Sequence, residues 1–343
     1  MDDDGLFRPE LAALAARQFG VALRRQAVTT GYGSVELRRL TASGRWVTIR
    51  RGAYVPAVHW ETLDHHEQWW LRDVAAHLTM VTPHVLSHDS AVRGLGLPML
   101  HPREWLTHIT RPGVLGSRTD HGVRHHLGRV SPRLVEVGGV TTTGLARTGL
   151  DMAREHGFKA GVVVLDEVKR RGTPDLELIR ELALMRSWPG VTTARAAYAF
   201  ADGRAESPGE SLLRVLVAEL GIGEVECQFP VSLGGGVVWS DLRVGCHLFE
   251  FDGRLKYVPV AEGGLADMSP TELLWAEKLR ERDLLEVGLG LSRVFWDDLM
   301  GPTAWAATSR RLREDYSRTV ARFGRALPEH LARFASDHPR RTA

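Results

Sequence analysis

The chain has 343 residues, 43% hydrophobic and 25% charged, as in a soluble globular protein of two or three domains. No apolar run approaches the roughly 20 residues of a membrane span, the start "MDDDG" is no signal peptide, and two cysteines suggest a reducing interior. We therefore expect a cytoplasmic protein that does not associate with a membrane. Residues 205–300 carry 17 acidic against eight basic side chains, whereas residues 1–60 and 301–343 are net basic and suit a polyanionic partner.

Residues 1–60 predict a small DNA-binding domain. The apolar residues of "PELAALAARQFG" recur at helical spacing up to Gly20, and "LRRQAVTTGYG" predicts a second short helix that ends in a turn. A third helix, "SVELRRLTASG", begins at Ser34, and the two β-rich runs of "RWVTIRRGAYV" follow it. This order is typical of a winged helix-turn-helix, in which the third helix enters the major groove of DNA.

The candidate DNA contacts are two arginines on the third helix and three in the wing: Arg38, Arg39, Arg45, Arg50 and Arg51. Guanidinium groups at these places meet phosphates and base edges, although the same arginines could form an ordinary solvated surface. Residues 8–58 resemble the N-terminal domain of AbiEi-type antitoxins, in which a helix of the kind "S..LRRL...GR" runs into a wing ending "RGAYV". That resemblance implies a DNA-binding autoregulator.

Residues 61–204 alternate helical and strand-like runs and predict a central mixed α/β domain. Within them, "LSHDSAVRGLGLP" and "VGGVTTTGLARTGLDMA" resemble the central region of AbiEi-like proteins. The run "DHGVRHHLG" invites a metal-site interpretation, but His121 and His125 would share a face only on a helix, and the glycines favour loop and strand. Residues 87–89, Ser-His-Asp, are consecutive, which is not the geometry of a catalytic triad. None of these motifs is a self-evident active site.

Residues 205–300 read helix, strand, strand, strand, helix, strand. The helix "SPGESLLRVLVAELG" begins at Ser207, and the strand-like runs are "VECQFPVSL", "VVWSDLRV" and "HLFEFDG". A two-residue Gly-Cys loop would join the second and third strands, which places Asp241 directly opposite Glu250. Two carboxylates so placed repel each other unless a cation intervenes. A register slip of one residue would remove this alignment.

This order of elements resembles the PD-(D/E)XK nuclease fold, and "EFDGRLKY" with "LSRVFWDDL" resembles the branch near very-short-patch-repair endonucleases. The resemblance implies hydrolysis of phosphodiesters with Mg²⁺ or Mn²⁺. On it, Asp241 and Glu250 would hold the metal, and Asp252 would be a further ligand or position water. Lys256 would stabilise negative charge, because Asp252 stands where the superfamily motif has its lysine. Glu210 is either an active-site acid or a helix-capping residue.

The predicted fold class is a multidomain α/β protein. Its four parts are a winged helix-turn-helix (1–60), a central mixed α/β domain (61–204), a restriction-endonuclease-like α/β domain with a mixed sheet (205–300) and a basic helical tail (301–343). Three functions stay open: a metal-dependent endodeoxyribonuclease, an AbiEi-like transcriptional autoregulator with a non-catalytic nuclease-like domain, and an antitoxin that neutralises a cognate toxin. The expected partner is DNA, and the oligomeric state is left open.

Overall fold

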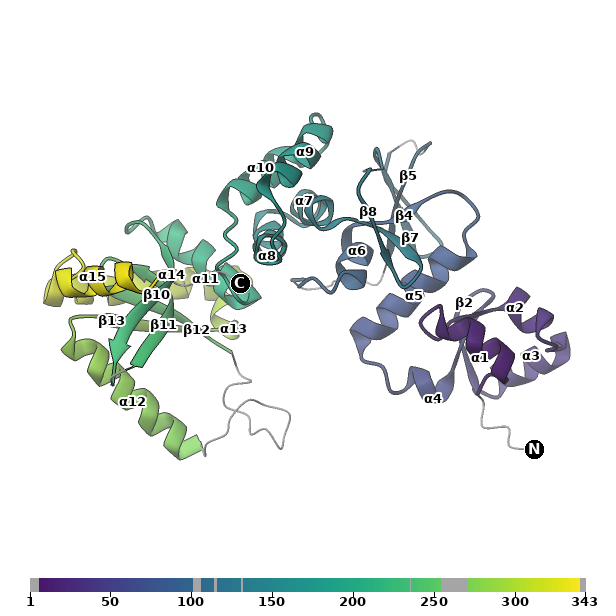
Figure 1. Cartoon of the computed structure of the whole chain (residues 1–343), viewed down its shortest axis with the longest axis horizontal. Coiled ribbons are helices and arrows are strands. Elements are labelled where there is room, and N and C mark those ends of the chain that lie inside the picture. The colour runs from purple at the N-terminus through teal and green to yellow at the C-terminus, as the bar shows by residue number, and fades with distance from the viewer. Residues whose placement is uncertain are drawn as a thin grey trace. The chain divides into compact units, whose positions relative to one another are not determined.

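The computed structural model describes residues 6–100, 106–113, 116–130, 132–234, 236–253 and 270–339 (Figure 1). The chain divides into two compact units: Met1–Val164 with Thr173–Ala199, and Leu165–Gly172 with Phe200–Ala343. Among the described residues, no helix is long and apolar enough to cross a membrane. The chain is therefore a multidomain protein that mixes helices with several sheets.

The first unit begins with the elements of the predicted winged helix-turn-helix. In chain order they are α1 (Pro9–Ala16), β1 (Ala22–Leu23), α2 (Arg24–Thr29), α3 (Ser34–Ala42), β2 (Trp46–Arg50) and β3 (Ala53–Pro56). The strands form a three-stranded sheet in the order β1-β3-β2. Gly31 has a φ of 88°, a left-handed conformation that glycine adopts at little cost, and it turns the chain between α2 and α3.

An aromatic cluster fixes the orientation of α3. Trp46 is 1% exposed, and its ring centroid lies 4.8 Å from that of Phe7 and 5.0 Å from that of Tyr32. Leu37 and Leu40 of α3 belong to the same buried cluster. Because residues 37 and 40 lie on one side of a helix, the intervening side chains of α3 must face outward.

The first unit continues as a six-stranded mixed sheet. Its strands are β4 (Val85–Leu86), β5 (Thr107–Arg111), β6 (Arg118–Asp120), β7 (Val123–Leu127), β8 (Leu134–Val137) and β9 (Val140–Thr143), in the order β6-β7-β5-β4-β9-β8. The pairs β5/β7 and β4/β9 are parallel, and the other pairs are antiparallel. The helices are α4 (Ala57–Trp60), α5 (His65–Thr79), α6 (His88–Gly94), α7 (Leu145–His156), α9 (Asp175–Leu184) and α10 (Val191–Phe200). Val55 of the wing shares one buried cluster with Val74 and Ile109.

The second unit has a four-stranded mixed sheet in the order β10-β11-β12-β13. Helix α8 (Phe158–Arg170) leads into it, followed by α11 (Pro208–Leu220), β10 (Glu226–Leu233), β11 (Gly236–Val244), β12 (His247–Asp252), α12 (Pro270–Glu286), β13 (Gly290–Phe295), α13 (Trp296–Leu299), α14 (Gly301–Phe323) and α15 (Glu329–Asp337). Among the strands described in this unit, only β12 and β13, which α12 connects, pair in parallel. The helix and strand order of residues 205–300 agrees with the sequence, whereas the nuclease-like fold and the domain boundaries stay predictions.

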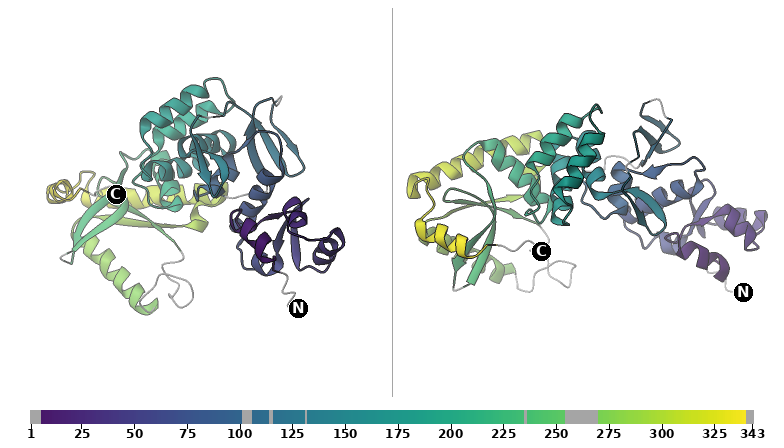
Figure 2. Two further views of the ribbon diagram at one scale, coloured as in Figure 1. Left: turned by 45° about the vertical axis from the view of Figure 1, so that its right-hand side comes forward. Right: turned by 45° about the horizontal axis from the view of Figure 1, so that its top comes forward.

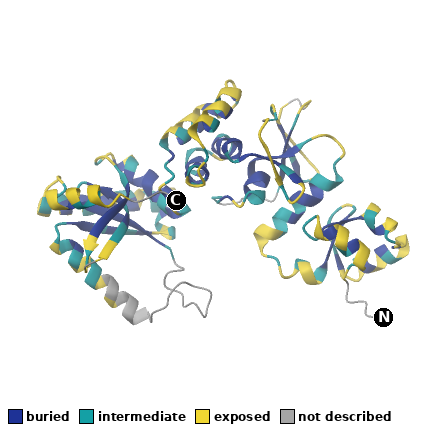
Figure 3. Ribbon diagram, viewed as in Figure 1, coloured by how far each residue is buried: buried dark blue, intermediate teal, exposed yellow. Residues whose placement is uncertain are grey.

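Helices α11 and α14 contact each other and cover one face of this sheet (Figure 2). A Cβ added to Gly209, at the start of α11, would lie 2.2 Å from the ring of Phe251, so only glycine allows this close approach. His247 shares that face, and its Nδ1 lies 2.7 Å from Oγ1 of Thr319 on α14. On the other face, Leu284 of α12, Leu331 of α15 and Leu248 form one buried cluster. Strand β12, which lies between these helices, is buried along its whole length (Figure 3).

His247 makes the stability of this unit depend on pH. Burial lowers its pKa from 6.5 to about 4, with Asp315 opposing the shift. The unfolded chain therefore binds more protons than the folded chain between pH 6.5 and 4, so acidification over that range destabilises the fold, by up to about 3 kcal/mol. Urea unfolding from pH 7 to 4 should lose this component in His247→Gln and keep it in His330→Gln, which alters an exposed histidine. Parallel pH curves for wild type and His247→Gln would contradict this.

Candidate nucleic-acid interface and acidic site

The exposed side of α3 carries the first pair of candidate arginines. Arg38 and Arg39 are both exposed, while Leu37 and Leu40 anchor the opposite side of the helix. At the start of α3, the Glu36 carboxylate accepts from Gly33 N–H at 3.4 Å, as expected for a capping acid. The second helix of a helix-turn-helix uses such outward side chains to contact DNA.

The wing region adds a basic hollow. Arg45 and Arg51 are exposed, and Arg51 lines a hollow of about 590 Å³ with Arg24 and Arg25 of α2. Three guanidinium groups around one hollow suit a phosphate. Arg50 differs, because it is partly buried, its Nη1 donates to His121 O at 3.3 Å, and burial lowers its pKa. Arg50 therefore contacts the β6–β7 turn, and its contact with DNA stays a prediction.

The register of the β11–β12 hairpin is the predicted one. Val244 pairs with His247 and Leu242 with Phe249, across the two-residue loop. Continuing that register places Asp241 opposite Glu250, but the ladder ends before this pair. Instead, the backbone N–H of Phe251 donates to Oδ2 of Asp241 at 2.7 Å. The first acid thus has a structural partner that the sequence did not predict.

Glu250 is neutralised by arginines. Its side chain is 12% exposed, Oε1 accepts from Arg280 Nη2 at 2.5 Å, and Oε2 lies 4.0 Å from Arg293 Nε. Arg280 comes from α12, and Arg293 pairs with Glu250 across the β12–β13 ladder. The cation that accompanies Glu250 in this structure is therefore a guanidinium.

Glu210 has the geometry of a capping acid. It accepts hydrogen bonds from Glu206 N–H at 2.9 Å and Ser207 Oγ at 2.9 Å, at the start of α11. It also accepts from Gln228 Nε2 at 3.1 Å. Gln228 has a φ of 57° in the middle of β10, and the pairs on either side of it place it opposite Asp241. A left-handed non-glycine residue inside a strand is strained, and such strain is found mostly at functional sites.

The remaining predicted site residues are Asp252 and Lys256. Asp252 is buried at the end of β12, two residues beyond Glu250, whereas Lys256 lies outside the described residues. Carboxylate oxygens on adjacent strands are suitable Mg²⁺ ligands. Binding by Glu250 would require its ion pair with Arg280 to open. Among described residues, no three of the acids bring ligand atoms within 4.8 Å of one another.

The structure also assembles a group that sequence reasoning did not find. His88, His108 and His126 meet in the first unit, each from a different element. The run "DHGVRHHLG" does form strand and turn as expected, with His121 exposed at the turn. What the sequence hides is that β5 and β7 are parallel neighbours. The sequence offers one indication of this group: each of the three histidines lies in or next to a run that predicts a strand or the start of a helix.

Comparison with known proteins supports the resemblance of the N-terminal segment to AbiEi antitoxins. Residues 9–57 match the family described as "Transcriptional regulator, AbiEi antitoxin". The uncharacterized proteins Rv2248 and MT2308, from two strains of Mycobacterium tuberculosis, are each 34% identical to this chain over 199 residues. The match covers 56% of this chain and 68% of each relative. The AbiEi-type resemblance of the N-terminal segment is thereby confirmed.

Proposed function

We propose that this chain, which belongs to one family with the uncharacterized mycobacterial proteins and carries an AbiEi antitoxin-family domain over residues 9–57, is a transcriptional regulator that binds DNA. One observation carries the proposal: α3 is held by its buried leucines so that Arg38 and Arg39 face outward. An exposed arginine can bond two acceptors of a guanine edge or a phosphate, so this face suits the major groove.

The wing supports the same function. A wing that carries Arg45 and Arg51 would follow the phosphate backbone while α3 reads the bases. The hollow between Arg51 and the start of α2 offers a second phosphate contact. In this proposal the wing arginines supply affinity that depends on salt, and the α3 arginines add sequence preference.

The test is the binding of the full chain to duplex DNA from its own upstream region, measured by fluorescence anisotropy against an unrelated duplex of equal length. We expect the upstream duplex to bind more tightly, by about 10³-fold or more at physiological salt. Equal affinity for both duplexes would mean non-specific binding and would contradict a regulator of its own gene.

An antitoxin role would add a protein partner to this DNA-binding function. The family description names an antitoxin, so a cognate toxin encoded beside this gene is the partner that we propose. Co-expression should then relieve the toxicity of that neighbouring protein. If the gene has no such neighbour, the antitoxin role is rejected and the proposal of a transcriptional regulator remains.

A second candidate function is hydrolysis of DNA phosphodiesters with Mg²⁺ in the second unit. The strained backbone of Gln228 favours it, because it lies opposite Asp241 and its side chain bonds Glu210. Mg²⁺ would be held by Asp241 and Glu250, and it would polarise the phosphate. Asp252 and Lys256 are the further residues of this proposed site.

The nuclease proposal predicts that Asp241→Asn and Glu250→Gln abolish Mg²⁺-dependent cleavage of duplex DNA and leave DNA binding intact. The asparagine amide oxygen can still accept from Phe251 N–H, so the Asp241→Asn variant removes the charge and keeps the structural bond. Arg280→Gln removes the same ion pair as Glu250→Gln but keeps the carboxylate, and Glu286→Gln alters an exposed acid of α12. Both of these should still cleave. Wild type that binds DNA without cutting it would reject the nuclease and leave the regulator proposal standing.

A further inference from the structure

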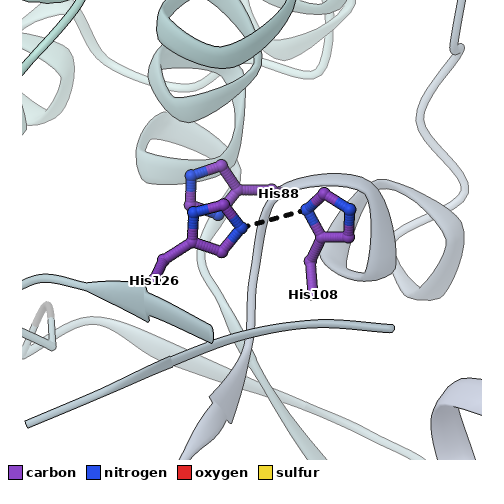
Figure 4. Close-up of side chains that lie close together, drawn as sticks. All are labelled: His88, His108 and His126. Carbon is purple, nitrogen blue, oxygen red and sulfur yellow. Dashed lines mark hydrogen bonds between the residues drawn. The ribbon is translucent and has the colours of Figure 1, made fainter. Parts of the chain in front are cut away.

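Three imidazoles meet in the first unit, and none of them belongs to the arginine face of α3. His88 is the first residue of α6, His108 lies on β5 and His126 lies on β7. They are 2%, 3% and 5% exposed. One ring nitrogen from each lies within 4.8 Å of the others, and this is the only such group of three or more among the described residues (Figure 4).

Two of these nitrogens are hydrogen-bonded to each other, at a spacing close to that of adjacent metal ligands. Nε2 of His126 lies 3.1 Å from Nδ1 of His108. Two nitrogens at about 2.0–2.1 Å from a tetrahedral Zn²⁺ are themselves about 3.4 Å apart. The ring of His88 stacks on that of His126 with centroids 3.7 Å apart (Figure 4). The ligand nitrogen of His88 lies within 4.8 Å of those of the other two rings, so the three nitrogens would have to draw together around an ion.

A carboxylate orients one of the rings from outside. Nε2 of His108 lies 3.1 Å from Oδ2 of Asp89, whose other oxygen lies 2.7 Å from His156 Nε2. A proton on Nε2 of His108 therefore points to Asp89 and leaves the Nδ1 lone pair directed at His126. Histidines that bind metals donate their second N–H to a carboxylate in this way, which fixes the tautomer. Nδ1 of His88 is likewise 3.0 Å from Oγ of Ser87.

The backbone and the protonation state of the group also suit a ligand role. His88 has a φ of 49°, a strained conformation that directs its ring into the group. Burial lowers the pKa of His108 to about 4 and that of His126 to about 3, so both rings are neutral at pH 7. Neutral imidazole is the form that binds a metal.

The group opens on a cavity of about 1050 Å³ in the same unit. His88 and His126 line it together with Arg147, Arg154 and Trp188. Arg147 and Arg154 both bond Asp151 at 2.6 Å, and Glu181 lies 3.8 Å from Arg147, so two carboxylates accompany the two guanidinium groups beside the histidines. A structural zinc site has four protein ligands, whereas a site with three ligands and an open side keeps a position for water or a substrate.

We propose that His88, His108 and His126 form a Zn²⁺ site whose fourth position opens into the cavity beside Trp188. Imidazole suits several transition metals, and three histidines with one open position are one of the ligand sets that zinc adopts in catalytic sites. The site serves a ligand that enters the cavity and completes the coordination of the ion. It is independent of DNA binding by α3 and of the acids on β11 and β12.

The test is titration of the full chain with Zn²⁺ and with Co²⁺ after dialysis against a chelator. We expect one ion per chain and the intense visible bands of tetrahedral Co²⁺. His126→Gln and His108→Gln should weaken Zn²⁺ binding by more than about 100-fold, and Asp89→Asn by about 10–100-fold. His77→Gln is the matched control, because His77 Nδ1 also lies 3.1 Å from a histidine nitrogen, that of His84, outside the group.

Two results would overturn the site: no stoichiometric Zn²⁺ or Co²⁺ binding by wild type, or unchanged affinity and Co²⁺ bands in a folded His126→Gln variant. If the variants do not fold, X-ray absorption spectroscopy of zinc-loaded wild type identifies the atoms that coordinate the ion. A first shell of three imidazoles supports the proposal, and a shell that contains sulfur or only oxygen rejects it.

Discussion

Replacing Arg38 and Arg39 of α3 together by alanine is expected to lower the affinity for the upstream duplex by about 1–3 kcal/mol per arginine. Both side chains are exposed and the leucines beside them are buried, so the change removes contacts with DNA and leaves the core intact. If the two guanidinium groups meet phosphates, the slope of log affinity against log salt should fall by about two. Anisotropy titrations at several salt concentrations measure both quantities.

The matched control for α3 is Arg17→Ala, which removes an exposed arginine at the end of α1. It carries the same loss of net charge per residue but lies on a helix that does not enter the groove in this fold. Its affinity and salt slope should stay close to those of wild type. Equal losses in Arg17→Ala and in the α3 variants would mean that net charge, and no particular face, drives binding.

Asp166→Ala is expected to destabilise the second unit by about 3–5 kcal/mol. Both Asp166 carboxylate oxygens lie 2.8 Å from Arg214 Nη2, and Oδ1 also accepts from Asp202 N–H at 2.8 Å. Asp166 is 1% exposed and Arg214 is 5% exposed. Alanine would leave the buried guanidinium without its counter-charge, which costs far more than the lost bond alone. Urea unfolding followed by circular dichroism gives the change in free energy.

Two further variants separate this buried pair from an ordinary ion pair. Glu329→Ala breaks a pair with Arg333 that is 89% and 74% exposed, and it should change stability by less than about 0.5 kcal/mol. Asp166→Leu combined with Arg214→Met removes both charges and should cost less than Asp166→Ala, because no buried charge is stranded. A loss in Asp166→Ala no larger than that in Glu329→Ala would show that water reaches the guanidinium.

Local patterns predict much of this fold. The helix start at Ser207 is correct because its Oγ accepts from Glu210 N–H, and the hairpin register is correct because a two-residue loop allows one pairing of the flanking strands. The outward direction of Arg38 and Arg39 follows from the spacing of the leucines in α3.

The partners of the site residues could not be predicted in this way. Arg280, which neutralises Glu250, is 30 residues along the chain and comes from the helix that crosses over the sheet. The left-handed backbone of Gln228 has no marker in the sequence, since glycine or asparagine usually signals that conformation. The three histidines converge only because β5 and β7 are parallel neighbours and α6 begins beside them, which is a matter of tertiary pairing.

The most direct test of the central claim is a reporter gene under the control of the chain's own upstream region, with the full chain supplied in trans. We expect wild type and Arg17→Ala to change reporter output equally. With the Arg38→Ala/Arg39→Ala double variant, reporter output should equal that measured when no protein is supplied. A reporter that responds equally to wild type and to the α3 double variant would contradict regulation through this helix.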